Sequence, residues 1–291
     1  MPAPSLIRVP TLQTRNLEEA RSGTLEELVD FITQHPRLLV LTGAGLSTRS
    51  GIPAYRNAQG KWIRRDPILY QEFIASATTR RRYWARSFFG WSLMDKAEPN
   101  AAHRALARFE ALGRITELVT QNVDGLHRAA GSQSLVELHG ALDQVSCLDC
   151  GHGMSRDDLQ TELEAANPDW RPEVLGYRPD GDAELDNSAY PGFQIVDCPV
   201  CGGRLKPDVV FFGESVPAER VQRIDQGLAD CDGVLVIGSS LVVMSGFRIV
   251  RQAAKLNRPV VAINDGRTRA DELLDFKVGG DCVEVLDQVL R

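Results

Sequence analysis

The chain has 291 residues, of which 43% are hydrophobic and 25% charged, and its net charge is −6. This length is enough for one large domain with attached modules or for two domains. The composition is ordinary for a soluble globular protein, no apolar stretch reaches membrane-spanning length, and no long basic run indicates a nucleic-acid partner. The first 23 residues have no apolar core of signal-peptide type, so we expect a cytoplasmic location.

Helical patterns and short apolar runs alternate along the chain. The first helix is predicted over 24–33, where apolar residues share one face and Thr24 can form a capping box with Glu27. Two further amphipathic helices are predicted at 101–112 and 246–256. Apolar, β-branched runs predict strands at 38–41, 116–120, 136–138, 234–237 and 259–263. Residues 282–286 fit either a last short strand or the start of a helix.

Strands separated by helices predict an α/β fold with right-handed crossovers and a mainly parallel sheet. Ligands of such sheets bind at the carboxyl ends of the strands. Glycine, polar or acidic clusters follow four of the predicted strands, at 42–47, 121–124, 238–240 and 264–266. Two regions interrupt the alternation, 52–100 and 147–204, and we expect them to build a smaller domain against the sheet.

Four of the six cysteines form two C-x-x-C pairs, Cys147 with Cys150 and Cys198 with Cys201. Without a secretion signal, paired C-x-x-C motifs favour a metal over disulfides. Four thiolates leave no open coordination position, so the spacing predicts a structural zinc ion. Segment 147–204 has few long apolar periodicities, and we expect that it needs the metal to fold. The alternative is four unrelated thiols. His152 could compete as a ligand but is expected at the surface.

Gly43 and Gly45 directly follow the first predicted strand. Without a Cβ they allow a phosphate to approach the peptide N–H groups. Thr48 occupies the third position of a dinucleotide fingerprint, so a tight strand–helix turn is the alternative. The following residues 51–56, Gly-Ile-Pro-Ala-Tyr-Arg, do not belong to an ordinary phosphate loop.

Polar residues also follow the strands at 116–120 and 136–138. Gln121, Asn122 and Asp124 offer donors and acceptors suited to ribose hydroxyls and a carboxamide, although a self-bonded turn is the alternative. His139 follows the next strand and is a candidate general base. A packed structural histidine is the alternative, and His127 is the competing base. His35 and His103 are expected to be structural.

With these motifs in place, the chain resembles the sirtuins, a family of NAD-dependent protein lysine deacylases. The matching segments occur in the family's order over about residues 25–290: Gly43 to Ser47, Gly51 to Arg56, Thr120 to Asp124, Leu138 to Gly140, both cysteine pairs, Lys206 to Glu214, Gly238 to Leu241, and Ile263-Asn264. The runs 83–86 and 207–214, with the long segment between the cysteine pairs, most resemble the sirtuin-4 branch (class II).

The resemblance implies a Rossmann-like, doubly wound parallel sheet with a smaller domain, which consists of a helical insertion and a zinc-binding module. The NAD-binding domain would be discontinuous, at 24–53, 101–146 and 205–291. A cofactor-binding loop and helical module would occupy 54–100. A zinc-binding module with a long insertion would occupy 147–204.

The resemblance also implies roles for individual residues around NAD. The phosphates would lie against Gly43, Ala44, Gly45 and Ser47. Tyr55 and Arg56 would belong to a mobile loop beside the nicotinamide ribose, which Gln121 would contact. His139 would be the catalytic base, with Asn122 and Asp124 lining the nicotinamide pocket. The adenosine half would lie among Gly238, Ser239, Ser240, Asn264 and Cys282.

The substrate implied is an acyl-lysine protein or peptide. Its backbone would lie between two segments, Val209-Val210-Phe211-Phe212-Gly213 and Leu241-Val242-Val243, which is a form of strand addition. The products implied are free lysine, nicotinamide and O-acyl-ADP-ribose. Two alternatives are a mono-ADP-ribosyltransferase that uses the same site and a non-catalytic zinc-module binding protein. A monomer is favoured.

Two departures from the family pattern, and one further resemblance, bear on the cofactor loop and on specificity. Ala54 stands where many relatives carry Asp. Between Cys150 and Cys198 lie the 47 residues 151–197, and the excess around 167–186 is either a solvated surface loop or an acyl-selecting element that reaches the acyl channel. Tyr83 and Arg86, at i and i+3, resemble the pair that holds acidic acyl chains in desuccinylating sirtuins. We expect modest activity at most on succinyl-lysine and better activity on larger or branched dicarboxyl or lipoyl-type chains.

Overall fold

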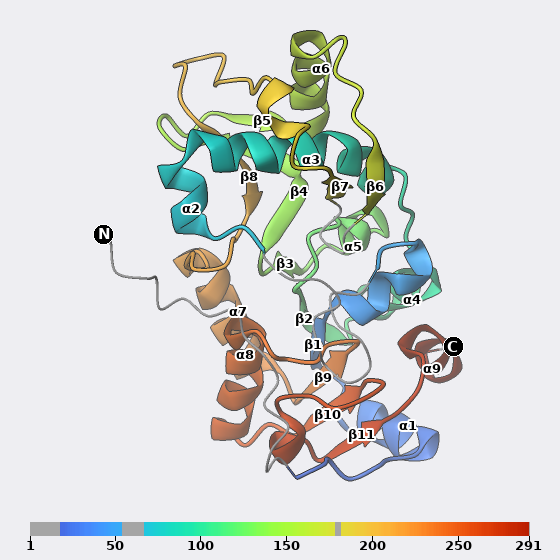
Figure 1. The fold of residues 1–291 in the computed structure, drawn as a ribbon. Coiled ribbons are helices and arrows are strands. Elements are labelled where there is room, and N and C mark those ends of the chain that lie inside the picture. The colour runs from blue at the N-terminus through green and yellow to red at the C-terminus, as the bar shows by residue number, and fades with distance from the viewer. Residues whose placement is uncertain (1–17, 54–66, 178–181, 291) are drawn as a thin grey trace.

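The structure is a computed structural model, which describes residues 18–53, 67–177 and 182–290. Its main sheet has six parallel strands in the order β11-β10-β9-β1-β2-β3 (Figure 1). The strands are β1 (Leu38–Thr42), β2 (Ile115–Thr120), β3 (Leu135–Glu137), β9 (Gly233–Ile237), β10 (Val260–Ile263) and β11 (Phe276–Val278). The chain order reverses between β1 and β9, which is the switch point where such sheets bind ligands.

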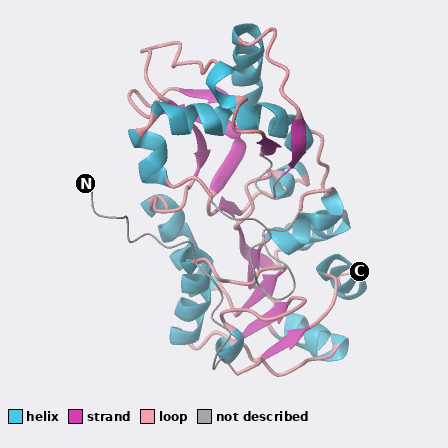
Figure 2. Ribbon diagram, viewed as in Figure 1, coloured by secondary structure: helices cyan, strands magenta, loops and turns pink. Residues whose placement is uncertain are grey.

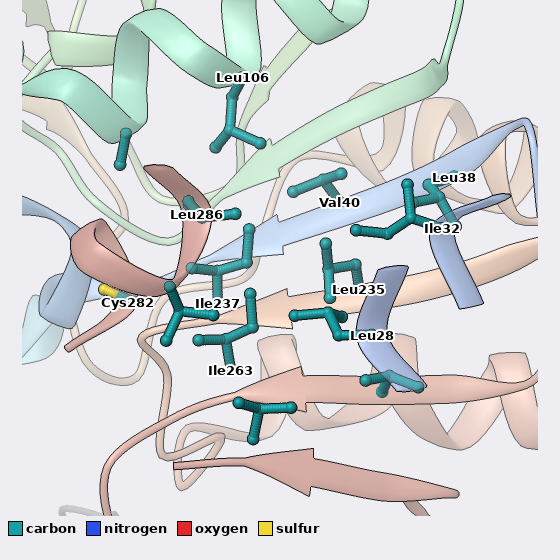
Figure 3. Packing of buried hydrophobic residues seen from close by; sticks show 14 of the residues in the cluster. Leu28, Ile32, Leu38, Val40, Leu106, Leu235, Ile237, Ile263, Cys282 and Leu286 are labelled. Atoms are coloured by element: carbon teal, nitrogen blue, oxygen red, sulfur yellow. The ribbon is translucent and has the colours of Figure 1, made fainter. Parts of the chain in front are cut away.

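Helices cover both faces of this sheet, so the doubly wound α/β prediction is confirmed (Figure 2). One face packs against α1 (Leu25–Gln34), α4 (Ala101–Ala111) and α9 (Cys282–Val289), and the other against α7 (Ala218–Asp230) and α8 (Met244–Lys255). Figure 3 shows the first face, where Leu28, Leu106 and Leu286 from three helices meet the strand residues. The predicted capping box starts α1: Thr24 Oγ1 accepts from the amide of Glu27 at 3.2 Å.

The sequence left residues 282–286 open between strand and helix, and the structure makes them helix α9. Asp281 caps this helix, since its Oδ1 accepts from the amide of Val283 at 2.8 Å. The last strand is instead β11, a three-residue strand that the sequence analysis did not predict. Among the described residues, no helix is both long and apolar enough to cross a bilayer.

A smaller body lies beyond the carboxyl end of β3, in the upper part of Figure 1. It contains α2 (Tyr70–Ala75), α3 (Ala77–Asp95), α6 (Arg156–Ala166) and an antiparallel sheet of β4 (Gly140–Cys147), β5 (Gly153–Ser155) and β8 (Leu205–Val209). The strands β6 (Val174–Tyr177) and β7 (Ala183–Leu185) form a separate pair. This body has its own apolar core, with Phe73, Trp84 and Phe193 buried. The expected limits of the domains remain predictions.

Three short 3₁₀ helices and one short α-helix are the remaining elements of the described residues. These are η1 (Ala44–Ser50), η2 (Tyr190–Gly192), η3 (Asp271–Leu273) and α5 (Leu126–Ala129). Of these, η1 and α5 follow β1 and β2 directly and carry residues that the sequence singled out. They form, with the loop after β9, the edge of the main sheet at which the candidate site lies.

Candidate active site

Two glycine turns meet at the switch point of the sheet. The amide of Gly45 donates to the carbonyl of Gly238 at 2.9 Å, and Gly238 has a φ of +61°. A Cβ on Gly45 would lie 2.9 Å from the Cα of Gly238, and one on Gly43 would lie 2.7 Å from the Cβ of Ser239. Contacts this short with backbone atoms leave no room for a side chain. The glycines therefore bring the loops after β1 and β9 into direct contact.

Ser47, expected at the NAD phosphates, and Asn122 and Asp124, expected at nicotinamide, converge beside these turns. Asn122 Nδ2 donates to the carbonyl of Gly43 at 3.1 Å and to Ser47 Oγ at 3.0 Å. Ser47 Oγ in turn donates to Asp124 Oδ2 at 2.7 Å. Burial raises the pKa of the Asp124 carboxyl, and its hydrogen bonds to Leu126 and Ser47 oppose that rise. The network fixes the amide and the carboxyl close to the expected phosphate loop.

His139 lies where β3 ends and β4 begins, and hydrogen bonds hold both of its ring nitrogens. Nδ1 lies 2.9 Å from the carbonyl oxygen of Gln121, and Nε2 lies 2.7 Å from Ser245 Oγ. Because a carbonyl only accepts, Nδ1 carries the proton and Nε2 accepts from the serine hydroxyl. Burial lowers the pKa of His139, while the Gln121 bond raises it. The imidazole is thus held neutral, as a general base must be.

Gln121 links the histidine to both glycine turns. Its Nε2 donates to Ser239 Oγ at 2.7 Å, and its backbone amide donates to the carbonyl of Thr42 at 3.0 Å. A Cβ on Gly246 would lie 2.4 Å from Gln121 Oε1. The first turn of α8 therefore packs directly against Gln121, which brings Ser245 to the imidazole.

The other predicted cofactor residues lie along the same edge. Cys282 is buried at the start of α9, with Sγ donating to the carbonyl of Gly45 at 3.4 Å. Asn264 is buried after β10, with Nδ2 donating to the carbonyl of Gly266 at 3.2 Å. Ala44 begins η1, and Ser240 follows the turn after β9. Tyr55 and Arg56, and with them Ala54, lie outside the described residues.

The competing histidines are all in structural positions. His127 is buried, with Nε2 lying 2.9 Å from Thr42 Oγ1, and burial lowers its pKa well below the usual value. His103 lies 4.8 Å from His127 between ring centroids and is equally buried. His35 contacts the carbonyl of Phe31 through Nδ1 at 2.8 Å. None of these three imidazoles is held as His139 is, between a backbone carbonyl and a serine hydroxyl at the edge of the sheet.

The segments expected to bind the substrate backbone lie on either side of His139. Strand β8 is an edge strand of its sheet, and the amide of Val210 donates to the carbonyl of His139 at 2.8 Å. Part of this segment is already paired, since the carbonyl of Phe212 accepts from the amide of Tyr70 at 2.9 Å. On the other side, Leu241 and Val242 are buried, and Leu241 has a φ of +53°. An edge strand next to His139 is a suitable place for strand addition.

The four paired cysteines form one cluster, as predicted. Their Sγ atoms all lie within 4.8 Å of one another, with Cys147 to Cys201 at 3.6 Å and Cys150 to Cys198 at 3.8 Å. Four sulfurs at about 2.3 Å from a tetrahedral zinc ion are about 3.8 Å apart, so the cluster fits zinc. The metal-ligand grouping found among the described residues does not include His152.

The two cysteine turns have the same backbone design. The amide of Cys147 donates to the carbonyl of His152, and that of Cys198 donates to the carbonyl of Gly203, both at 2.8 Å. A glycine with positive φ follows each pair, Gly151 at +74° and Gly202 at +68°. Both turns need this left-handed residue to bring the two sulfurs of a pair to the same ion.

The long insertion folds back onto α3. Asp182, just before β7, forms a buried ion pair with Arg86, with Oδ2 and Nη2 2.8 Å apart. The ring of Trp170 also packs against Phe88 and Phe193. The described part of the insertion is therefore built into the smaller body. It is not a solvated loop throughout.

One residue at this site was missed by the sequence reasoning. Ser245 follows the Gly238 to Val243 run, but nothing in the sequence pairs it with His139. The serine comes to the imidazole from a segment 106 positions away.

A family comparison agrees with this geometry. Residues 43–245 match the Sir2 family. A relative from Xanthomonas axonopodis pv. citri (strain 306), named an NAD-dependent protein deacetylase, is 54% identical over 259 residues, which cover 89% of this chain and 88% of the relative. A relative of the same name from Bordetella bronchiseptica (strain ATCC BAA-588 / NCTC 13252 / RB50) is 51% identical over 94% of this chain and 99% of its own.

Solved structures give the same answer. A Sir2 complex with a p53 peptide and NAD⁺ has a TM-score of 0.75 at 27% identity, covering 92% of this chain and 98% of the other. The structure of another Sir2 enzyme has a TM-score of 0.73 at 30% identity, and the match covers 91% of this chain and 96% of the other. The fold and site define a Sir2-type, NAD-dependent enzyme. The chain belongs to the Sir2 family, the sirtuins, and the deacylase activity and NAD dependence expected from the sequence are confirmed at the level of that family.

Proposed function

We propose that the chain removes acyl groups from lysine side chains of proteins or peptides, and that it favours acyl groups larger than acetyl, of the dicarboxyl, branched or lipoyl type. NAD would be consumed, with nicotinamide and O-acyl-ADP-ribose as the other products. One observation carries the proposal: a neutral histidine, His139, lies at the switch point beside the Ser47–Asn122–Asp124 network. We further infer membership of the sirtuin-4 branch, which the long insertion supports.

The residues present fit NAD as the co-substrate. Gly43, Gly45 and Gly238 form a side-chain-free floor for the phosphates, while Asn122 and Asp124 offer an amide and a carboxyl to the carboxamide of nicotinamide. Bound NAD supplies the electrophilic ribose carbon. Nε2 of His139 is then the group that accepts a proton from a ribose hydroxyl, since Nδ1 already donates to Gln121.

The preference for larger acyl groups is supported by the environment of Arg86. A guanidinium facing the acyl channel could hold a short acidic chain, but Asp182 already supplies a carboxylate to Arg86. That pairing argues against tight binding of succinyl-lysine at Arg86. It also places the insertion against the helix that carries Tyr83, where it can limit or shape the channel.

A panel of lysine peptides that carry acetyl, succinyl, glutaryl, branched dicarboxyl and lipoyl groups tests the proposal. The protein is incubated with NAD and each peptide, and the products are read by mass spectrometry. Bare lysine with O-acyl-ADP-ribose is the expected result, with acetyl slower than the larger groups. Equal or faster turnover of acetyl-lysine would contradict the preference, and a peptide that gains ADP-ribose would show a transferase instead.

Deletion of 167–186 separates the two readings of the insertion. If the insertion selects the acyl group, the ranking of the panel changes in the deletion variant. An unchanged ranking with retained activity would mean that the insertion has only a structural role.

His139→Ala should abolish turnover of every peptide. We also propose that the protein acts as a monomer in the cytoplasm, where the two cysteines outside the zinc cluster, Cys231 and Cys282, stay reduced.

A further inference from the structure

Lys206 is a buried lysine whose ammonium group joins the two ends of one turn. It lies in β8, just before the turn formed by residues 209–213, and only 5% of it is exposed. Nζ donates to the carbonyl of Pro207 at 3.2 Å and to that of Val209 at 2.6 Å, and it lies 3.1 Å from Glu214 Oε2. An ammonium group has three N–H donors, so these three oxygens satisfy all of them. One cation thereby connects the residues before the turn with the residue that follows it.

Glu214 is the second half of this connection. Its Oε2 also accepts from the amide of Phe211 at 2.9 Å, and its own amide donates to the carbonyl of Phe211 at 3.0 Å. Gly213 has a φ of +86°, a left-handed conformation that lets the chain reverse directly before Glu214. The carboxylate therefore bonds the ammonium group and the backbone inside the turn at once, so the shape of the turn depends on this ion pair.

Stability alone does not account for a cation at this position. Burial lowers the pKa of Lys206, and the charge of Glu214 opposes that fall. Two aromatic rings also lie near Nζ, with 4.9 Å to the centroid of Phe211 and 5.9 Å to that of Tyr70. Replacing a buried ion pair by apolar side chains of similar volume is often neutral or stabilising. The main consequence of the pair is therefore the geometry that it imposes on the turn.

The turn that the ion pair shapes borders His139. The amide of Val210 donates to the carbonyl of His139 at 2.8 Å, and the carbonyl of Phe212 accepts from the amide of Tyr70 at 2.9 Å. Each of these anchors is a single backbone hydrogen bond. The ion pair supplies the further bonds that fix the backbone between the anchors and on either side of them.

We propose that Lys206 is a positioning residue for the acyl-lysine substrate: together with Glu214 it holds residues 209–213 in the shape that accepts the substrate backbone. The proposal rests on the proposed deacylase function and on strand addition at this segment. The NAD phosphates are expected at the glycine turns after β1 and β9, outside this turn. Loss of the ion pair should therefore weaken binding of the peptide and leave the affinity for NAD as it is.

The test measures the KM for an acyl-lysine peptide at saturating NAD, and the affinity for NAD by calorimetric titration. We expect Lys206→Met and Glu214→Ala each to raise the peptide KM about tenfold or more, as for loss of a charged hydrogen bond, with the NAD affinity unchanged. Glu214→Gln keeps a side-chain oxygen that can accept from Phe211 and Lys206. It should therefore raise the peptide KM less than Glu214→Ala does.

Lys277→Met is the matched control. The side chain of Lys277 is 15% exposed, and its Nζ donates to the carbonyl of Gly266 at 3.0 Å and lies 3.0 Å from Asp271 Oδ2. This second lysine–carboxylate pair lies at the far edge of the main sheet, in β11 and η3. Its loss should lower the melting temperature without a change in the peptide KM.

An unchanged peptide KM in folded Lys206→Met would overturn the positioning role, because a lysine needed only for packing would change the melting temperature alone. If thermal melting shows that Lys206→Met does not fold, the double variant of Lys206→Met with Glu214→Gln removes both charges and leaves neither without its partner. The same rise of the peptide KM is expected there, and its absence would overturn the proposal. Absence of turnover for every acyl peptide in the wild type would instead refute the proposed function.

Discussion

Ser245 Oγ lies 2.7 Å from Nε2 of His139, on the edge of the imidazole opposite the Gln121 carbonyl. The serine is the second residue of α8, and the next residue, Gly246, packs against Gln121. A single helix end therefore supplies one hydrogen-bond partner of His139 and packs against the other. This arrangement fixes the plane of the ring and the nitrogen on which the proton resides.

We expect Ser245→Ala to lower kcat by about fivefold, because one hydrogen bond that holds the base contributes about 1 kcal/mol. Ser245→Thr keeps the hydroxyl and should recover most of the rate. Nitrogen NMR of the imidazole should show a shifted Nε2 resonance in Ser245→Ala, while the Nδ1–H tautomer set by the Gln121 carbonyl is kept. An unchanged spectrum with a lowered rate would mean that the serine acts through packing.

The pH dependence of kcat/KM should report His139. In the proposed mechanism His139 acts only when neutral, and burial lowers its pKa below the usual 6.5. The rate should therefore be constant near neutrality and fall as the pH drops below 6.5, with a midpoint on the acid side of that value. A midpoint above 6.5 would show that the free enzyme does not hold the imidazole as described.

Zinc removal should unfold the smaller body. Strands β4 and β8 end next to the cysteine turns, so loss of the ion removes the link between their ends. A strong chelator, or Cys150→Ser, should release zinc, lower the melting temperature and abolish activity. Cys231→Ala lies outside the cluster and should keep one zinc per chain by metal analysis. Full activity without zinc would contradict the structural role.

Acid should destabilise the fold through the buried histidine pair. Burial lowers the pKa of His103 from 6.5 to about 4. Between these two pH values, His103 binds a proton in the unfolded chain but not in the folded chain. Stability is fully present above pH 6.5 and is lost as the pH falls toward 4, by about 3 kcal/mol from His103 alone. Denaturant unfolding at several pH values measures this. His103→Gln should reduce the dependence of the unfolding free energy on pH. An unchanged dependence would mean that other groups cause the loss of stability in acid.

Gly45→Ala should weaken NAD binding at least tenfold, because its Cβ would lie 2.9 Å from the Cα of Gly238 and would push the two turns apart. Calorimetric titration with NAD measures the effect. Gly279→Ala is the matched control, since a Cβ there meets nothing within 4 Å. Equal affinities of the two variants would show that the contact between the turns is not needed for NAD.

The sequence alone determined most of the framework. Strong apolar runs placed five of the six strands of the main sheet, and the capping residues placed α1, because these signals are local. The doubled C-x-x-C spacing determined the metal site, since each turn needs only neighbouring residues. The clusters after the strands indicated His139, Asn122 and Asp124, because carboxyl ends of parallel strands meet at one edge.

Only the tertiary structure decided what surrounds those residues. Ser245 contacts His139 although the two residues are 106 positions apart in the sequence. Arg86 of α3 likewise pairs with Asp182 of the insertion. The short strand β11 forms by pairing with β10 in the sheet. Residues Cys282 to Val289 form a helix, which Asp281 caps. The pattern of neighbouring residues indicates helix or strand periodicity and turn types. It does not indicate which distant residue a side chain will contact. For that reason the sequence determined the reaction class of this sirtuin, whereas the fold decided which residues hold the imidazole of His139.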